Sequence, residues 1–340
     1  MHVLVTGGAG YIGSRLVPAL IDRGFKVTVI DKLYFGESGL EPVKDKLRLF
    51  TADVRDVPET AFEGVDAIIH LAGLSNDPTA EYNPAANLQI NTEATVDLAR
   101  RAKQRKIERF VFASSCSIYY TLHPDDTLRD EKYPIAPKAP YSLSKHEAEK
   151  GLSALADDHF SPVMLRKGTV FGPSRRMRYD LVVNTFTKDA FADRRLVIHA
   201  GGRMWRPMLH IDDAVEAYIA AVEAPRHKVH NQVFNVLSEN YRVLDLGYQV
   251  RHVLEQQKGI RLDLQVQQVG TSRSYRVDGS KFRETLGVEC QRPIGEAVDE
   301  IWDELEGGTE YDNPIYYNIR WLELLCDMHR RLKVMNGRVF

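Results

Sequence analysis

Tyr141 and Lys145 are the first residues of this sequence whose types and spacing could do chemistry. They are four positions apart, so a helix through this segment would place both side chains on one face. A free phenol has a pKa of about 10 and is a weak base at neutral pH, but a neighbouring ammonium group stabilises the phenolate. Ser115, at the end of a predicted strand, could hydrogen-bond to the same substrate hydroxyl. The three residues predict a proton-transfer site; the alternative for the Tyr/Lys pair alone is a solvated helix face.

A glycine-rich turn could hold a pyrophosphate. The segment Gly7-Gly8-Ala9-Gly10-Tyr11-Ile12-Gly13 lies between a predicted strand and a predicted helix. There a phosphate can approach backbone N–H groups that a Cβ would obstruct. Asp31 lies 18 residues past Gly13, where a carboxylate can accept from both hydroxyls of an adenosine ribose and repel a 2′-phosphate. The turn therefore predicts a dinucleotide site that favours NAD over NADP, and Lys32 beside Asp31 weakens that preference. A glycine turn without a ligand is the alternative.

Two further strand ends fit a dinucleotide. Asp53-Val54 follows the third predicted strand, where Asp53 could meet an adenine amino group or simply cap the strand. The fourth predicted strand ends in small residues, Leu71-Ala72-Gly73, at the crevice where ligands of such sheets bind. Ser75 could reach a sugar or the nicotinamide side of the cofactor. A bound, positively charged nicotinamide would add to Lys145 in lowering the pKa of Tyr141.

The elements that must position these residues alternate along the first half of the chain. Continuously apolar runs at 3–6, 26–30, 47–50, 67–71, 110–113 and 163–165 predict strands, and 12–23, 91–105 and 142–156 predict helices. Strands that alternate with helices and are apolar on both faces indicate a parallel, doubly wound Rossmann sheet of the α/β class. We expect a cofactor domain at 1–167, to which 232–250 returns. A smaller α/β substrate domain, with a C-terminal helix, is expected at 168–231 and 251–340.

Taken together, these motifs resemble the extended short-chain dehydrogenase/reductase superfamily, and within it the NAD-dependent nucleotide-sugar epimerase/dehydratase family, which includes the UDP-glucose 4-epimerases. The resemblance depends on the turn at 6–13, on Ser114-Ser115-Cys116-Ser117-Ile118-Tyr119, and on the Tyr141/Lys145 pair. Softer similarities follow at 165–173, 205–213 and 278–287.

The resemblance implies a redox-neutral reaction in which bound NAD takes a hydride from a sugar carbon, usually C4, and returns it to the other face. Tyr141 would be the acid/base, Lys145 would tune it and hold the nicotinamide ribose, and Ser115 would orient or shuttle the proton. Arg206 would clamp the substrate diphosphate bidentately, and Arg273 is a weaker second clamp. The catalytic residues predicted are Ser115, Tyr141 and Lys145. Cofactor-binding residues are predicted at Gly7, Gly10, Tyr11, Ile12, Gly13, Asp31, Lys32, Asp53, Val54, Leu71, Ala72, Gly73, Ser75, Asn91, Tyr141, Lys145 and Lys167. Substrate-binding residues are predicted at Ser75, Ser115, Ser117, Thr169, Arg178, Arg206 and Arg273, and no metal site is predicted.

The sequence departs from the family pattern just after Ser115. Dehydratases of this family resemble one another in an Asp-Glu pair there, and this chain has Cys116 and Ser117. Neither is a strong acid or base at neutral pH unless activated, which argues against 4,6-dehydration. Cys116 is interpreted as a small packing residue. Many 4-epimerases carry an asparagine where this chain has Thr169, which puts that substrate contact in doubt.

Composition excludes several classes of protein. With 45 basic and 47 acidic residues, the net charge of −2 gives no general attraction to nucleic acid or to an anionic membrane. No apolar run is long enough for a transmembrane helix, and the first residues do not read as a signal peptide. The 3 widely separated cysteines indicate a reducing compartment, so a cytoplasmic protein is expected. The resemblance implies a homodimer formed through the helices at 91–105 and 142–156. The apolar face at 315–332 is expected to pack on the protein's own body, or else to meet a partner.

Three functions therefore stay open. The first is an NAD-dependent nucleotide-sugar epimerase, acting at C4. The second is an NAD(P)-dependent reductase, dehydrogenase or dehydratase of a nucleotide-linked keto-sugar. The third is a non-catalytic dinucleotide-sensing protein, against which the intact Tyr141/Lys145 pair argues.

Overall fold

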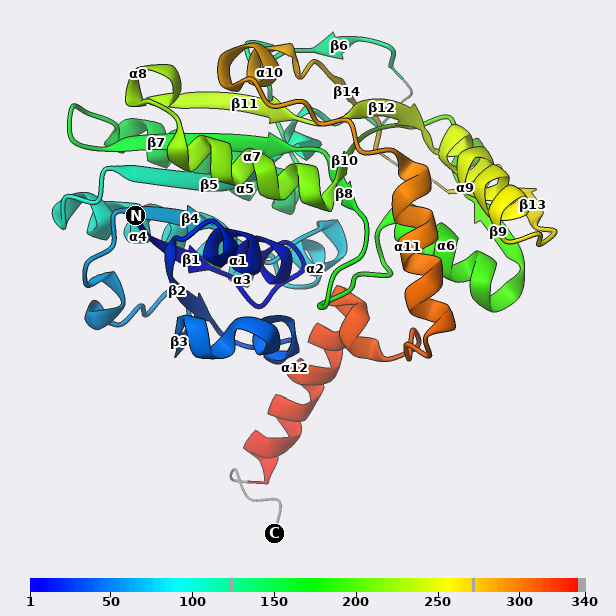
Figure 1. The fold of residues 1–340 in the computed structure, drawn as a ribbon, viewed down its shortest axis with the longest axis horizontal. Helices are drawn as coiled ribbons and strands as arrows, with labels where there is room; N and C mark the ends of the chain where they lie inside the picture. Colours follow the sequence, from blue (N-terminus) through cyan, green and yellow to red (C-terminus); the bar gives the residue numbers. More distant parts are fainter. Residues whose placement is uncertain (123–124, 271–272, 336–340) are drawn as a thin grey trace.

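Seven parallel strands form the central sheet of this computed structural model, which describes residues 1–122, 125–270 and 273–335 (Figure 1). The strand order is β11-β7-β5-β4-β1-β2-β3. The chain runs outward from β1 to β3 and then returns to place β4 on the other side of β1. The order therefore reverses beside β1, where the carboxyl ends of the strands leave a crevice for a ligand. The strands are β1 (His2–Thr6), β2 (Lys26–Asp31), β3 (Arg48–Thr51), β4 (Ala67–His70), β5 (Arg109–Ser115), β7 (Ser161–Lys167) and β11 (Gln232–Val236).

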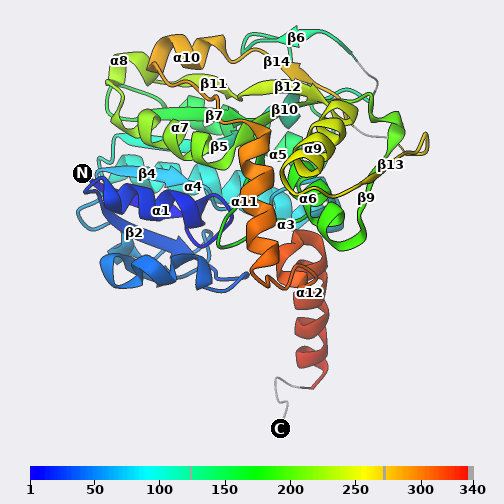
Figure 2. The ribbon, with the colours of Figure 1, turned by 45° about the vertical axis from the view of Figure 1, so that its right-hand side comes forward.

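Helices cover both faces of this sheet, which is why its strands are apolar on both sides (Figure 2). Val3 and Val5 of β1 pack into the core shared with α1 (Gly13–Asp22) and α7 (Ile211–Glu223). Leu4 between them packs into the opposite core, shared with α4 (Ala94–Gln104) and α5 (Pro140–Leu155). This arrangement confirms the predicted α/β doubly wound parallel sheet.

A second group of elements follows β7 and has a core of its own. Its helices α6 (Val182–Asp193), α9 (Val243–Gln257) and α11 (Ile294–Glu306) pack around Phe171, Met208 and Trp302. Three small sheets join it: β8 (Thr169–Phe171), β10 (Trp205–His210) and β12 (Glu239–Arg242); β9 (Arg195–Ile198) with β13 (Asp263–Val266); and β6 (Leu128–Arg129) with β14 (Arg276–Val277).

The segment 232–250 returns to the central sheet over a shorter length than predicted. β11 pairs with β7 in parallel, but β12 pairs with β10 and α9 packs against α6 and α11. The difference arises because the chain crosses from one sheet to the other within two residues, between Val236 and Glu239, and no linker sequence marks that crossing.

Short helices connect the larger elements. They are α2 (Asp77–Tyr82), α3 (Pro84–Leu88), α8 (Arg226–Val229), α10 (Ser280–Leu286), the 3-10 helices η1 (Ser38–Lys46), η2 (Glu59–Phe62), η4 (Cys116–Tyr119), η5 (Ala200–Gly202) and η6 (Pro314–Tyr316), and the π-helix η3 (Gln89–Glu93).

The last helix, α12 (Asn318–Val334), begins against the body and then projects away from it (Figures 1 and 2). Its first turns contact η6 and α2. Leu324 and Met328 are 46% and 52% exposed, so the apolar face expected to pack on the body is covered only in part. Within the described ranges, no helix has the length and apolar character needed to cross a bilayer.

Candidate active site

A cavity opens at the carboxyl ends of β1, β2, β3 and β4, where the sheet order reverses. Sixteen of the seventeen residues predicted to bind the cofactor line it, all except Asn91. They include the glycine turn, the acidic strand ends and the Tyr141/Lys145 pair, so residues from the first 167 positions of the chain meet around one space. The sixteen are Gly7, Gly10, Tyr11, Ile12, Gly13, Asp31, Lys32, Asp53, Val54, Leu71, Ala72, Gly73, Ser75, Tyr141, Lys145 and Lys167.

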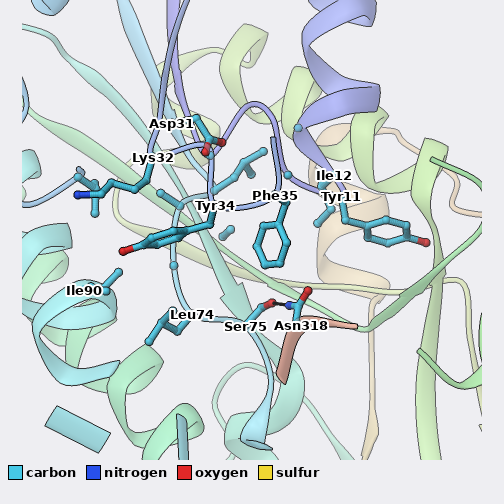
Figure 3. A pocket seen from close by; sticks show the side chains of 18 of the residues that line it. Tyr11, Ile12, Asp31, Lys32, Tyr34, Phe35, Leu74, Ser75, Ile90 and Asn318 are labelled. Carbon is cyan, nitrogen blue, oxygen red and sulfur yellow. Dashed lines mark hydrogen bonds between the residues drawn. The ribbon is translucent and has the colours of Figure 1, made fainter. Parts of the chain in front are cut away.

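The glycine turn is packed too closely to admit side chains at two positions. Gly7 has φ +73°, and a Cβ there would lie 2.7 Å from the backbone nitrogen of Ala72. A Cβ at Gly13 would lie 2.4 Å from the carbonyl oxygen of Gly7. Tyr11 lines the cavity, but its side chain points away (Figure 3), and its hydroxyl donates to the carbonyl of Gly172 at 2.6 Å. The turn therefore offers backbone to the cavity, as a pyrophosphate requires.

Asp31 lies at the end of β2 with its carboxylate at the cavity (Figure 3). It accepts the backbone N–H groups of Ala9 at 2.9 Å and Leu33 at 2.8 Å, one on each oxygen. Each carboxylate oxygen has a second lone pair, so ribose hydroxyls can still donate to it. Burial raises the pKa of Asp31, against the two backbone hydrogen bonds and the charge of Arg176. Lys32 turns to Asp53, at 3.2 Å, and so leaves Asp31 without a lysine neighbour in direct contact.

Asn91 is the cofactor candidate that does not line the cavity. Its side chain is fully buried, accepts the backbone N–H of Leu74 at 2.8 Å and donates to the carbonyl of Leu74 at 2.9 Å. These two bonds hold the Gly73–Leu74 backbone at the cavity wall. Asn91 is therefore placed as a support for the loop after β4, which sequence reasoning could not distinguish from a direct contact.

Sequence reasoning missed other residues of the cavity wall. Arg176 belongs to the basic cluster Arg175–Arg178, for which the sequence leaves open a contact with the nucleotide or a solvated loop. Asn318 and Leu322 come from α12, more than 170 residues beyond Lys145. No local signal predicts that α12 returns to this cavity, because its apolar pattern does not say where it packs. The residues not predicted are Ile30, Tyr34, Phe35, Ala52, Leu74, Ile90, Ala113, Arg176, Asn318 and Leu322.

Tyr141 and Ser115, which are predicted to transfer a proton, lie together with Ser117. The Ser115 hydroxyl donates to the Ser117 hydroxyl at 3.0 Å. Burial raises the pKa of Tyr141 to about 12 and the charge of Asp77 adds to this, while hydrogen bonding to Ser115 and the charge of Arg178 act in the opposite direction. The lowered pKa that the sequence predicts is therefore not a property of the protein alone, because removing the phenolate from water outweighs its favourable neighbours.

Lys145 is almost completely buried on the same helix, α5, with its Nζ 4.7 Å from the centre of the Phe112 ring. Burial, with the charge of Lys167, lowers the pKa of Lys145 to about 7, and Glu149 opposes this. A buried ammonium at this position is therefore maintained at a cost in stability, and any anionic group bound nearby would favour it.

Replacing Lys145 with methionine is expected to raise the free energy of unfolding of the cofactor-free protein by about 2–4 kcal/mol below pH 7. Between the folded pKa of about 7 and the ordinary value of 10.5, the unfolded chain binds more protons than the folded one. Wild-type stability therefore rises with pH over this window, and the gain from Lys145→Met fades as pH approaches 10.5. Urea unfolding across this range measures it. Lys150→Met, on the exposed side of α5, is the control, expected within about 0.5 kcal/mol of wild type; an equal gain in both variants would contradict the prediction.

Two of the substrate candidates, Ser75 and Arg178, line the same cavity as the glycine turn, and two others, Thr169 and Arg206, lie beside Tyr275. Arg206 has its guanidinium carbon 5.7 Å from the centre of the Tyr275 ring, and Thr169 hydrogen-bonds to Tyr275. Burial lowers the pKa of Arg206, with Tyr275 and Asp77 acting in the opposite direction. The Arg178 guanidinium donates to the Ser75 hydroxyl at 3.3 Å, so it reaches the loop after β4.

Arg273 is engaged by this protein's own acidic residues. It forms ion pairs with Asp77 and Glu81 of α2, and its guanidinium stacks 4.6 Å from the centre of the Tyr120 ring. A diphosphate would have to displace two carboxylates to use it, so the structure favours Arg206 over Arg273 as the clamp.

Cys116 lies behind the site and not in it. Its thiol is fully buried and donates to the carbonyl of Arg166 at 2.9 Å, and burial raises its pKa far above the ordinary value. This placement agrees with a packing role. Within the part of the chain that the structure describes, no three His, Cys, Asp or Glu side chains gather as they would around a metal ion.

Comparison with known proteins places this arrangement in a family. A model of the NAD dependent epimerase/dehydratase family matches residues 3–236. A putative UDP-glucose 4-epimerase of Methanocaldococcus jannaschii is 28% identical over 225 residues, which is 65% of this chain and 73% of that protein. The UDP-glucuronic acid decarboxylase 1 of Xenopus tropicalis is 30% identical over 66% of this chain and 54% of its own length.

Solved structures of nucleotide-sugar enzymes have the same fold as this chain. The UDP-glucose 4-epimerase of Thermotoga maritima with UDP-glucose superposes with a TM-score of 0.78 and 25% identity, covering 90% of this chain and 99% of that one. Others of similar score are complexes with NAD. The matches include epimerases, decarboxylases and dehydratases of nucleotide sugars. From the family match, the sheet and the cavity that holds its glycine turn, it follows that the chain belongs to the NAD dependent epimerase/dehydratase family.

Proposed function

We propose that this protein is an NAD-dependent nucleotide-sugar epimerase that acts at C4 of the sugar. One observation carries the proposal: Tyr141, joined to Ser115 and Ser117, borders the dinucleotide cavity, and the two positions after Ser115 hold a buried thiol and a hydroxyl and no carboxylate. Exchange of a hydroxyl proton needs only the tyrosine, whereas loss of water would need a further acid and base.

The residues of the cavity fit NAD. The glycine turn presents backbone at the N-terminus of α1, Asp31 can accept from ribose hydroxyls, and Tyr141 and Lys145 stand at the other end beside Ala113. When bound, NAD supplies a nicotinamide that accepts a hydride from the sugar carbon and returns it. The protein then has to move one proton and let the keto-sugar present its other face.

Tyr141 performs the proton transfer in this proposal. Its phenol oxygen takes the proton of the sugar hydroxyl and later gives it back, while Ser115 hydrogen-bonds to the same oxygen and Lys145 supplies positive charge from one turn further along α5. The charge of Arg178 also favours the phenolate, because it lowers the pKa of Tyr141.

The substrate would lie between Tyr141 and β10. Arg206 is half-buried beside Tyr275 and is the group best placed to meet a diphosphate, and its fork suits two phosphate oxygens. Relatives are named for reactions of UDP-sugars, and solved structures of similar fold contain UDP-glucose or UDP-glucuronic acid. These two compounds are therefore the first substrates to test.

Incubation with UDP-glucose, UDP-glucuronic acid and the dTDP-, GDP- and CDP-sugars, followed by NMR, tests the reaction. An epimerase forms the C4 epimer with no net consumption of NAD and no release of water or carbon dioxide. Stoichiometric turnover of added NAD(P)H would instead support a reductase, and loss of carbon dioxide or water would support a decarboxylase or dehydratase. Inactivity with every sugar nucleotide would contradict the proposal.

We also propose that the protein forms a homodimer through α4 and α5. The two helices lie side by side on one face of the sheet, as a helix-pair interface requires. Analytical ultracentrifugation is expected to give twice the 38.6 kDa mass of the chain, and a monomer at micromolar concentration would contradict this.

A further inference from the structure

A loop between β8 and α6 is fastened directly to the glycine turn. The Ser174 hydroxyl donates to the carbonyl of Tyr11 at 2.7 Å and lies 2.7 Å from the hydroxyl of Ser14. From the other direction, the Tyr11 hydroxyl donates to the carbonyl of Gly172. Two residues beyond Ser174, the side chain of Arg176 lines the same cavity as the turn. The geometry therefore fixes a guanidinium opposite the N-terminus of α1.

Arg176 is held in place by two groups from distant parts of the chain. Its guanidinium carbon lies 3.6 Å from the centre of the Phe35 ring, in the loop after β2. Its Nη2 donates to the Asn318 side-chain oxygen at 2.6 Å, at the start of α12. Asn318 in turn donates to the Ser75 hydroxyl at 2.7 Å, the bond drawn in Figure 3. Phe35, Ser75 and Asn318 all line the cavity, so Arg176 is oriented within the cofactor site.

The charge of Arg176 is only partly offset by the protein, through the more distant carboxylates of Asp180 and Asp31. Its side chain is only 4% exposed, yet within the described part of the chain it forms no salt bridge, and its buried Nε has no hydrogen-bond partner. Arg178, two residues away, is paired with both oxygens of Asp180 at 2.9 and 2.8 Å. Burial and the charge of Arg178 lower the pKa of Arg176 to about 9. A buried cation without a carboxylate in direct contact is costly, and a bound anion would complete this site.

The pyrophosphate of the dinucleotide is the anion that belongs beside the glycine turn, at a helix N-terminus. We propose that Arg176 is a further cofactor-binding residue that meets this pyrophosphate, and that Phe35 and Asn318 are its positioning residues. The first turn of α12 is then part of the cofactor site. Three residues anchor this helix to the body: Asn318 and Leu322 in the cavity wall, and Trp321, whose indole donates to the carbonyl of Tyr34. The inference concerns cofactor binding and holds whichever sugar reaction the protein catalyses.

NAD affinity, measured by calorimetry on protein stripped of nucleotide, tests the proposal without turnover. Arg176→Gln is expected to weaken NAD binding tenfold or more. Arg176→Lys is expected to weaken it less, because lysine keeps the positive charge, and Asn318→Ala is expected to weaken it about threefold to tenfold. Arg175→Gln is the matched control, since Arg175 is the exposed neighbour, and it is expected within twofold of wild type. Melting temperatures verify that each variant folds, and if Arg176→Gln does not fold, Arg176→Lys and Asn318→Ala carry the test.

Smaller ligands locate the contact. Arg176→Gln is expected to lower the affinity for ADP, which carries a diphosphate, and to leave the affinity for adenosine unchanged. Three results would overturn the proposal: NAD affinity equal to wild type in both Arg176 variants; loss of NADP affinity alone, which would place Arg176 at the ribose 2′ position; or loss of UDP affinity with NAD unchanged, which would assign Arg176 to the substrate.

Discussion

Tyr141→Phe is expected to lower epimerase turnover by about 10²–10⁴-fold and to leave NAD bound. The substitution removes one oxygen from a side chain that is 7% exposed and keeps its ring, so the cavity wall retains its shape. The lost oxygen is the one that hydrogen bonding to Ser115 and the charge of Arg178 act on. Because the phenol is the group proposed to take the sugar proton, the loss should appear in kcat more than in KM.

The measurement is NMR-monitored epimerisation with the substrate identified for the wild type, together with the NAD content of the purified variant. Tyr82→Phe is the control, because Tyr82 is 43% exposed on α2 and its change should leave turnover within twofold. Ser115→Ala should show a smaller loss than Tyr141→Phe, since Ser115 acts through the same hydroxyl. Turnover of Tyr141→Phe within fivefold of wild type, with NAD retained, would remove Tyr141 from the proton-transfer role.

Glu149→Ala is expected to lower the free energy of unfolding by about 3–5 kcal/mol, the largest stability effect we predict. Glu149 on α5 is buried beside Arg166 on β7, which donates to both carboxylate oxygens, with Nη2 at 2.7 Å and Nε at 3.0 and 3.2 Å. Ser114 on β5 also donates to it, at 2.5 Å. Removing the carboxylate leaves a buried guanidinium without its counter-ion and a buried hydroxyl without its acceptor, and both cost desolvation free energy.

Urea unfolding measures this loss. Glu147→Ala, on the same helix but in an exposed ion pair with Lys150, should cost less than about 1 kcal/mol. The double variant Glu149→Met, Arg166→Met should be more stable than Glu149→Ala, because it removes both charges and fills their space. If Glu149→Ala and Glu147→Ala destabilise equally, the buried pair does not stabilise the fold more than an exposed one does. The same pair lies behind Ser114 and Cys116, so its loss should also reduce turnover by moving β5 relative to α5.

Much of the cofactor half of the site could be predicted because its signals are local in sequence. Gly7 and Gly13 must be glycine for the turn to pack at all, and Asp31 follows directly from the apolar strand that precedes it. Carboxyl ends of parallel strands meet at one edge, so naming the strands was enough to bring Asp31, Asp53 and Ala72 to one cavity.

Residues that act through others could not be predicted in the same way. Asn91 supports a backbone instead of facing the cavity, and Arg273 is occupied by Asp77 and Glu81. Asn91 was predicted to bind the cofactor and Arg273 the substrate, but an amide or a guanidinium can equally hold the protein's own backbone or carboxylates. The pKa of Tyr141 is raised where the sequence predicts that it is lowered, for a related reason. Burial is a property of the packed structure, and in this site its effect on the pKa outweighs that of the neighbouring positive charge.

The sequence by itself determined the doubly wound sheet, the glycine turn and the shared helix of Tyr141 and Lys145, because each depends on patterns within single strands, turns or helices. Only the tertiary structure decided how the site is completed. It brings Phe35, Arg176 and Asn318, from three widely separated segments, into contact in the cavity wall and leaves the buried Arg176 without a salt bridge among the described residues. Such contacts are set by how helices and loops pack after the sheet has formed, and no periodicity or motif encodes them.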